Sequence, residues 1–101
     1  MTTTVGHRAR FTWTRARVEH GLPDVTKYVN PVQEPGISPP WDVDAWSLVC
    51  EFEKSPRSQG NPSIAHVRFL VPGAPAHWLH PGRTLWIWEG ANHAATIEVL
   101  D

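Results

Sequence analysis

The C-terminal stretch, residues 64–101, constrains the fold most, because short extended segments alternate there with strong turn signals. The extended segments are residues 64–71, 84–89 and 94–100. The turn signals between them are Pro72-Gly73, Pro81-Gly82 and Glu89-Gly90. Apolar residues at every second position, or in a run too short for a helix, are typical of β-strands. The sequence therefore predicts three strands, onto which the upstream part of the chain packs.

Two more strands are expected upstream of this stretch. Residues 45–53 carry apolar side chains at alternate positions: Trp46, Leu48, Cys50 and Phe52. Residues 8–18 begin in the same way with Ala9, Phe11 and Trp13, but beyond Thr14 the alternation would place Arg15 and Arg17 on the apolar face. Because a strand cannot change faces without a bulge, we expect the first strand to bend or end near Thr14.

The segment between these strands, residues 19–45, is rich in proline and is predicted to be a long loop. Each proline removes a backbone donor and excludes a long helix. At most a short edge strand is expected there, over residues 25–29, with Tyr28 and Val32 as its anchors. Residues 1–7 are small and polar, and we expect them to form a disordered tail.

The fold class follows from the number and spacing of these elements. A chain of 101 residues is long enough for a single core, so residues 8–101 are expected to form one domain. Turn signals that recur about every ten residues favour a small barrel over a sandwich. We therefore predict an all-β protein, a closed antiparallel barrel of about six strands.

The order of these strands and turns resembles the C-terminal β-barrel domain of elongation factor Tu and related translation GTPases. The residues that carry the resemblance are Val67, Phe69, Leu70, Gly82, Leu85, Ile87, Glu89, Gly90, Ile97 and Val99. The resemblance implies a Greek-key barrel, a bacterial protein and a binding scaffold, since the chemistry of that family lies in another domain. The chain has no phosphate-binding Gly-x-x-x-x-Gly-Lys-Ser/Thr motif, which excludes GTPase activity.

Composition narrows the possible partners and the cellular location. A net charge of -1 gives the whole molecule no attraction to nucleic acid or to an anionic membrane. No apolar run is long enough to span a bilayer. The first residues lack the pattern of a secretory signal, and a single cysteine forms no internal disulfide. We expect a cytoplasmic protein without membrane partners.

Six tryptophans are many for a chain of this length. If Leu85 and Ile87 point into the barrel, Trp86 and Trp88 point outward, together with Trp78 or Trp41 from adjacent loops. An exposed cluster of this kind would bind another protein, or a second copy through an exposed strand. In the alternative arrangement the proline-rich loop folds over these indoles and buries them.

Four arginines form the only charge cluster: Arg8, Arg10, Arg15 and Arg17. Residues two apart on a strand share a face, so Arg8 and Arg10 would lie about 7 Å apart. This spacing suits phosphates of RNA or carboxylates of a protein partner. Alternatively, these arginines pair with Glu51 or Glu53 across the sheet.

The remaining reactive side chains give weaker patterns. His77, His80 and His93 lie in turns and would form a metal site if they converged. Cys50 shares a face with Leu48 and is expected to be buried and inert. Asp42 and Asp44 are expected to be solvated side chains, and Glu89 is expected to bond backbone amides in its turn.

Three functions remain compatible with the sequence. The first is a non-enzymatic protein-binding module, such as an adaptor or the immunity partner of a toxin, which uses the tryptophans. The second is an RNA- or translation-associated module that uses the arginines. The third is a small enzyme or metal-binding protein that uses the loop histidines. We predict the first, with no catalytic residue, metal or cofactor, because it requires neither a charge excess nor a catalytic set.

Overall fold

The structure, a computed structural model, describes residues 6–41 and 45–101. Six strands make up most of this part of the chain: β1 (His7–Trp13), β2 (Lys27–Gln33), β3 (Trp46–Phe52), β4 (Ser63–Phe69), β5 (Thr84–Glu89) and β6 (Asn92–Val99). Three short helical segments lie between them: α1 (Arg15–His20), α2 (Pro56–Gln59) and the 3-10 helix η1 (Ala76–Leu79). The predicted tail begins with residues outside the described part of the chain, and its last residue, His7, belongs to β1.

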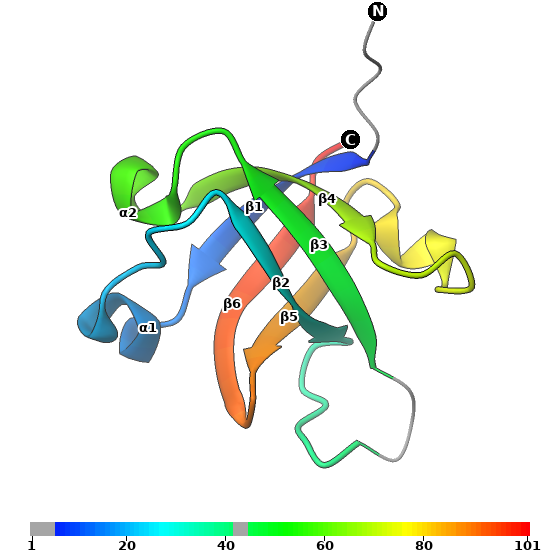
Figure 1. Cartoon of the computed structure of the whole chain (residues 1–101). Coiled ribbons are helices and arrows are strands. Elements are labelled where there is room, and N and C mark those ends of the chain that lie inside the picture. The colour runs from blue at the N-terminus through cyan, green and yellow to red at the C-terminus, as the bar shows by residue number, and fades with distance from the viewer. Residues whose placement is uncertain (1–5, 42–44) are drawn as a thin grey trace, which may run out of the picture.

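The strands form a closed barrel in the order β1-β4-β3-β2-β5-β6, and every neighbouring pair is antiparallel (Figure 1). The prediction of an all-β, closed antiparallel barrel of about six strands is therefore confirmed. The Greek-key description and the likeness to elongation factor Tu stay predictions. The pairing between β2 and β5 is short, because it joins only Val32 to Ile87 and Gln33 to Trp86.

The barrel interior is filled by alternate side chains of each strand, as the period-two patterns predicted. Four aromatic rings pack together there: Phe11, Trp13, Tyr28 and Phe52. The rings of Phe11 and Phe52 meet edge to face, with centroids 5.1 Å apart. Leu85 and Ile87 also point into this core, which leaves Trp86 on the outer face of β5, whereas Trp88 follows a register irregularity and is itself buried.

The first strand ends at Trp13, which confirms the expected end near Thr14. The next residues were predicted as a bent strand or loop, but they form helix α1. Thr14 caps this helix by accepting a hydrogen bond from the backbone N–H of Arg17 at 3.3 Å. Gly21 ends it with a φ of 106°, a conformation that favours glycine. Residues 15–20 have no helical pattern of apolar side chains, so the capping residues Thr14 and Gly21 favour the helix there.

The proline-rich segment contains a full strand, β2, where at most a short edge strand over residues 25–29 was predicted. Pro31 lies within this strand, opposite Ser47 of β3. The carbonyl of Ser47 accepts a hydrogen bond from Leu70, on the other side of β3. The β2–β3 ladder therefore needs no N–H from residue 31, and proline is tolerated there.

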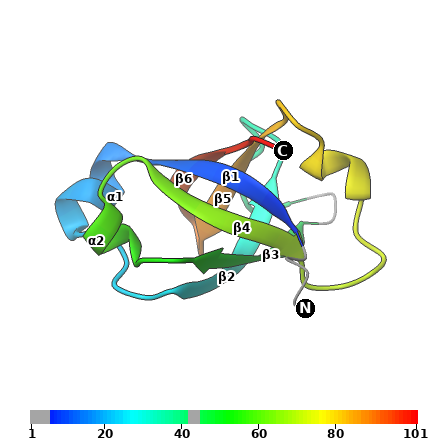
Figure 2. The same ribbon diagram turned by 90° about the horizontal axis from the view of Figure 1, so that it is seen from above.

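The helical segments lie at the two ends of the barrel (Figure 2). The α1 and α2 helices cover one end, and η1 lies near the other end. None of the helices in the described part of the chain is long and apolar enough to cross a membrane. Asp42 and Asp44, which were expected to be solvated, lie outside the described residues.

Cys50 points into the core and has no exposed surface. Burial raises the pKa of its thiol far above the ordinary range, because a thiolate would lose its hydration. We expect a water-soluble disulfide reagent to modify Cys50 only as fast as the barrel opens. The same reagent should react at once in a denaturant. Rapid modification of the folded protein would show that the strand register of β3 is wrong.

Candidate functional site

The outer face of β5 carries an aromatic cluster, formed by Trp86, Trp88, His93 and Trp41. The His93 ring stacks on Trp86 with centroids 3.8 Å apart, and Trp41 meets Trp88 edge to face at 6.1 Å. Only 5% of Trp88 is exposed, and its indole N–H is buried with no acceptor among the described residues. Trp88 is therefore covered, as in the alternative arrangement in which the proline-rich loop folds over these indoles. Trp86 and Trp41 are half-buried.

Trp78 lies apart from this cluster, at the η1 end of the barrel. Its ring packs against Phe69, with centroids 6.4 Å apart, and it belongs to the main core. Phe69 is only partly buried, because β4 leaves the barrel at this residue. Trp78 therefore does not add to an exposed tryptophan surface on β5.

The exposed arginines of the predicted cluster are all paired with carboxylates. Arg8 contacts Asp101 at 3.2 Å, Arg10 contacts Glu98 at 2.8 Å, and Arg15 contacts Glu19 at 3.0 Å. The expected partners Glu51 and Glu53 do not pair with these arginines, and Glu51 instead contacts Arg68 at 3.3 Å. In each pair the carboxylate neutralises the arginine that would otherwise bind a phosphate. The outer face of β1 is therefore not a basic patch.

Arg17 belongs to a partly buried network at the C-terminal end of β5, around Glu89. Its Nε lies 3.0 Å from Glu89 Oε1, and the Tyr28 hydroxyl donates to Glu89 Oε2 at 2.5 Å. Arg17 also donates to the backbone carbonyl of Gly21. The expectation that Glu89 bonds the amides of its turn is wrong, because its carboxylate receives side-chain donors from α1 and β2. The network ties these elements to the β5–β6 hairpin.

This network predicts a loss of stability at alkaline pH. Burial, together with the Glu89 carboxylate, raises the pKa of Tyr28 well above its ordinary value. The unfolded phenol loses its proton near pH 10, whereas the folded phenol keeps it, so stability falls as pH rises past about 10. Tyr28 is the only tyrosine, so phenolate absorbance should develop only as the protein unfolds. A phenolate that forms near pH 10 without unfolding would contradict the buried position.

The loop histidines do not converge. His93 faces Trp88 at the hairpin end of β5, whereas His77 and His80 lie at the η1 end, before β5 begins. Among the described residues no group of three His, Cys, Asp or Glu side chains is placed to hold a metal ion. The ring Nε2 of His93 donates to the Ala95 carbonyl at 3.0 Å, and burial lowers the pKa of His93.

Besides an open region of about 640 Å³ beside Lys27 and Lys54, two concave regions of the surface are large enough to receive part of a ligand. One, of about 660 Å³, lies between α1 and the β5–β6 hairpin. Its charged side chains Arg17 and Glu89 already bind each other, so they are not available to a ligand. The other is an apolar groove of about 530 Å³ near the η1 end of the barrel. We call this second region the mouth groove.

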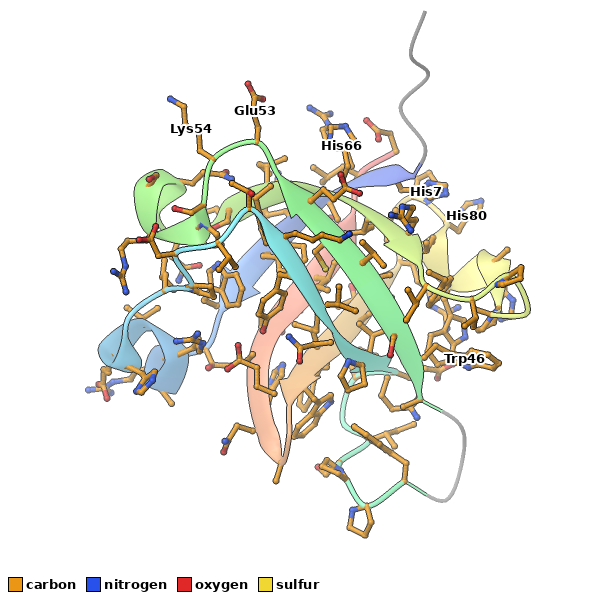
Figure 3. The ribbon with its side chains drawn as sticks, viewed as in Figure 1. His7, Trp46, Glu53, Lys54, His66 and His80 are labelled. Atoms are coloured by element: carbon orange, nitrogen blue, oxygen red, sulfur yellow. The ribbon has the colours of Figure 1, made fainter. Side chains whose placement is uncertain are left out.

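The mouth groove lies between the loop that follows β2 and the loop that carries η1. Its lining residues are Gln33, Glu34, Ile37, Trp46, Gly73, Pro75 and Trp78. Figure 3 shows Trp46 pointing outward from the start of β3, beside the loop that carries η1. Gln33 is fully buried and makes contacts within the chain, so the groove offers mainly indole and aliphatic surface.

Exposed apolar side chains lie in and near the groove. Leu70 is 54% exposed, Val71 is 44% exposed and Ile37 is 38% exposed. The backbone N–H of Leu70 donates to the Ser47 carbonyl, which continues the β3–β4 pairing one residue past Phe69. Leu70 and Val71 therefore lie beside the start of β3, whereas Ile37 lines the groove itself.

Sequence reasoning missed Ile37, Leu70 and Val71 as surface residues. Val71 was assigned to an extended segment over residues 64–71, because it continues an apolar alternation. The strand β4 ends before it, at Phe69. Trp46, expected on the apolar face of its strand, is partly buried and packs against the core. Two adjacent apolar residues, Leu70 and Val71, directly before Pro72-Gly73 were the available signal, since one of them must face solvent.

Comparisons of the chain with protein-family models, with curated proteins and with solved structures found no match. The resemblance to the barrel domain of elongation factor Tu therefore stays a prediction from sequence.

Proposed function

We propose that the chain is a non-enzymatic protein-binding module and that the mouth groove is its binding surface. The observation that supports this most is the apolar lining of the groove, to which Ile37, Pro75 and the indoles of Trp46 and Trp78 contribute. Of the six large apolar residues exposed in the described chain, Ile37 lines the groove, and Leu70 and Val71 follow the end of β4 nearby. Apolar clusters of this kind on a soluble domain mark interaction sites, and tryptophan is enriched where binding energy concentrates.

The chemistry of the groove supports binding without catalysis. Its described lining holds one carboxylate, Glu34, and includes no histidine, cysteine or serine. Acyl transfer or general acid-base chemistry needs such groups within hydrogen-bond reach of a substrate. The arginine pairs described above leave no cluster of unpaired arginines for RNA. The buried thiol of Cys50 fits a reducing compartment, so we also propose the cytoplasm as the place of action.

This function is tested by affinity capture with the tagged protein from an extract of its own cells. A partner bound through apolar contacts should stay bound in high salt, because salt screens charges and not apolar surface. We expect Trp46→Ala combined with Ile37→Ser, both at residues that line the groove, to abolish capture. Trp86→Ala, which alters the outer face of β5, should retain it. Capture that depends on Trp86 and not on Trp46 would move the binding surface to β5 and refute the groove.

A further inference from the structure

The loop that follows β2, residues 34–41, lies over the indole of Trp88. The ring of Trp41 meets the ring of Trp88 edge to face, with centroids 6.1 Å apart. Ser38 and Pro39 line the same cleft as Trp88, between α1 and the β5–β6 hairpin. Trp88 is buried but does not belong to the main core. This loop therefore forms part of the cover that keeps Trp88 from water.

Few polar contacts hold residues 34–41 against the barrel. Within the described ranges, 6–41 and 45–101, the only ion pair of this loop joins Glu34 to Arg83 at 3.0 Å. The next hydrogen bonds stay inside the loop, because the Ile37 N–H donates to the Glu34 carbonyl and the Trp41 indole donates to the Ile37 carbonyl. Segments with few buried contacts open at a lower free energy than the core. Beyond Glu34, apolar packing that includes the Trp41 ring attaches the loop to β5.

The closed loop leaves one polar group unpaired. Trp88 Nε1 is buried and has no acceptor in the part of the chain that the structure describes. The Trp13 indole is buried to a similar degree, but it donates to Ser63 Oγ at 3.0 Å. A buried donor without an acceptor loses its hydration and gains no hydrogen bond in return. When the loop opens, water can accept from the Trp88 N–H, so the unpaired donor favours opening.

We propose that residues 34–41 form a lid that opens and closes over Trp88 while the barrel stays folded. Opening exposes Trp88 at the outer face of β5 and hydrates its indole N–H, and closing restores the contact with Trp41. The lid also supplies Glu34 and Ile37 to the mouth groove, so the groove is complete only when the lid is closed. The motion requires no bound partner, and it therefore goes beyond the proposed function.

Hydrogen exchange of the indole N–H groups, followed by ¹⁵N NMR on the folded chain, tests for this lid. The Trp88 N–H should exchange faster than the Trp13 N–H, because it needs only the local opening. Its rate should be nearly independent of low urea concentrations, since a small opening exposes little surface. The Trp13 N–H should exchange through unfolding of the barrel, and its rate should rise with urea. Equal rates with equal urea dependence would show that Trp88 is exposed only by unfolding, which overturns the lid.

Two variants of Trp41 test whether this ring is part of the cover. Trp41→Ala should speed exchange of the Trp88 N–H about tenfold or more, because the aromatic contact is lost. Trp41→Phe keeps a ring and loses only the bond to Ile37, so it should retain most of the protection. The Trp13 signal reports in the same spectra that the barrel stays folded. Unchanged exchange of Trp88 in Trp41→Ala would show that the loop does not cover it, which also overturns the lid.

Discussion

Replacing Phe11 with alanine is expected to lower the free energy of unfolding by about 3–5 kcal/mol. The Phe11 side chain has no exposed surface, and its ring contacts Phe52 of β3 and Trp13 of its own strand. The substitution removes these contacts and leaves a cavity that rigid neighbouring strands cannot fill. Urea denaturation measures the loss, and the melting temperature should fall by about 4–8 °C for each kcal/mol.

Phe69→Ala is the matched control for this prediction. Phe69 is the same residue type on a neighbouring strand, but the end of β4 leaves it only partly buried. We expect a smaller loss, because part of its ring surface is already in water in the folded state. If Phe11→Ala costs no more than Phe69→Ala, the packing of β1 against β3 and β4 described above is incorrect.

Glu89→Ala is expected to lower stability by about 2–4 kcal/mol. The substitution leaves the Arg17 guanidinium, whose side chain is 18% exposed, and the Tyr28 hydroxyl without their shared acceptor. Both groups are then kept from water without that hydrogen-bond partner, which lowers the free energy of unfolding. Thermal and urea unfolding of the variant measure the effect, and circular dichroism checks that the barrel still forms.

Two further variants show whether burial causes this effect. Tyr28→Phe removes one hydrogen bond and should cost about 1–2 kcal/mol. Arg8→Ala removes an ion pair whose partners are both more than half exposed, and it should cost less than about 1 kcal/mol. A loss in Glu89→Ala as small as that in Arg8→Ala would show that the network contributes no more than a surface pair.

Sequence patterns predicted the fold well where one face of a strand is buried. The alternation of Leu48, Cys50 and Phe52 could be read directly, because a strand with one face in the core repeats with period two. The same reasoning placed Leu85 and Ile87 inside the barrel and Trp86 outside. Pro-Gly and Glu-Gly pairs marked the turns, because proline fixes its φ angle and glycine adopts positive φ angles without steric cost.

The parts that sequence reasoning missed depend on contacts between distant residues. β2 was hidden because Pro31 suggests a loop, and only the position of Ser47 in the ladder explains why proline is tolerated there. Helix α1 buries no side chain completely, so it leaves no apolar period to detect. The candidate site was missed for a related reason, since the lining of the groove comes mainly from two loops that are distant in sequence.

The central claim, that the mouth groove is the binding surface, is tested most directly by the indole N–H resonances of the ¹⁵N-labelled protein. Six signals are expected, one for each tryptophan. On addition of a captured partner, we expect the signals of Trp46 and Trp78 to shift and that of the buried Trp13 indole to stay unchanged. A shift confined to Trp86 and Trp41 would place the partner on the outer face of β5 and contradict the claim.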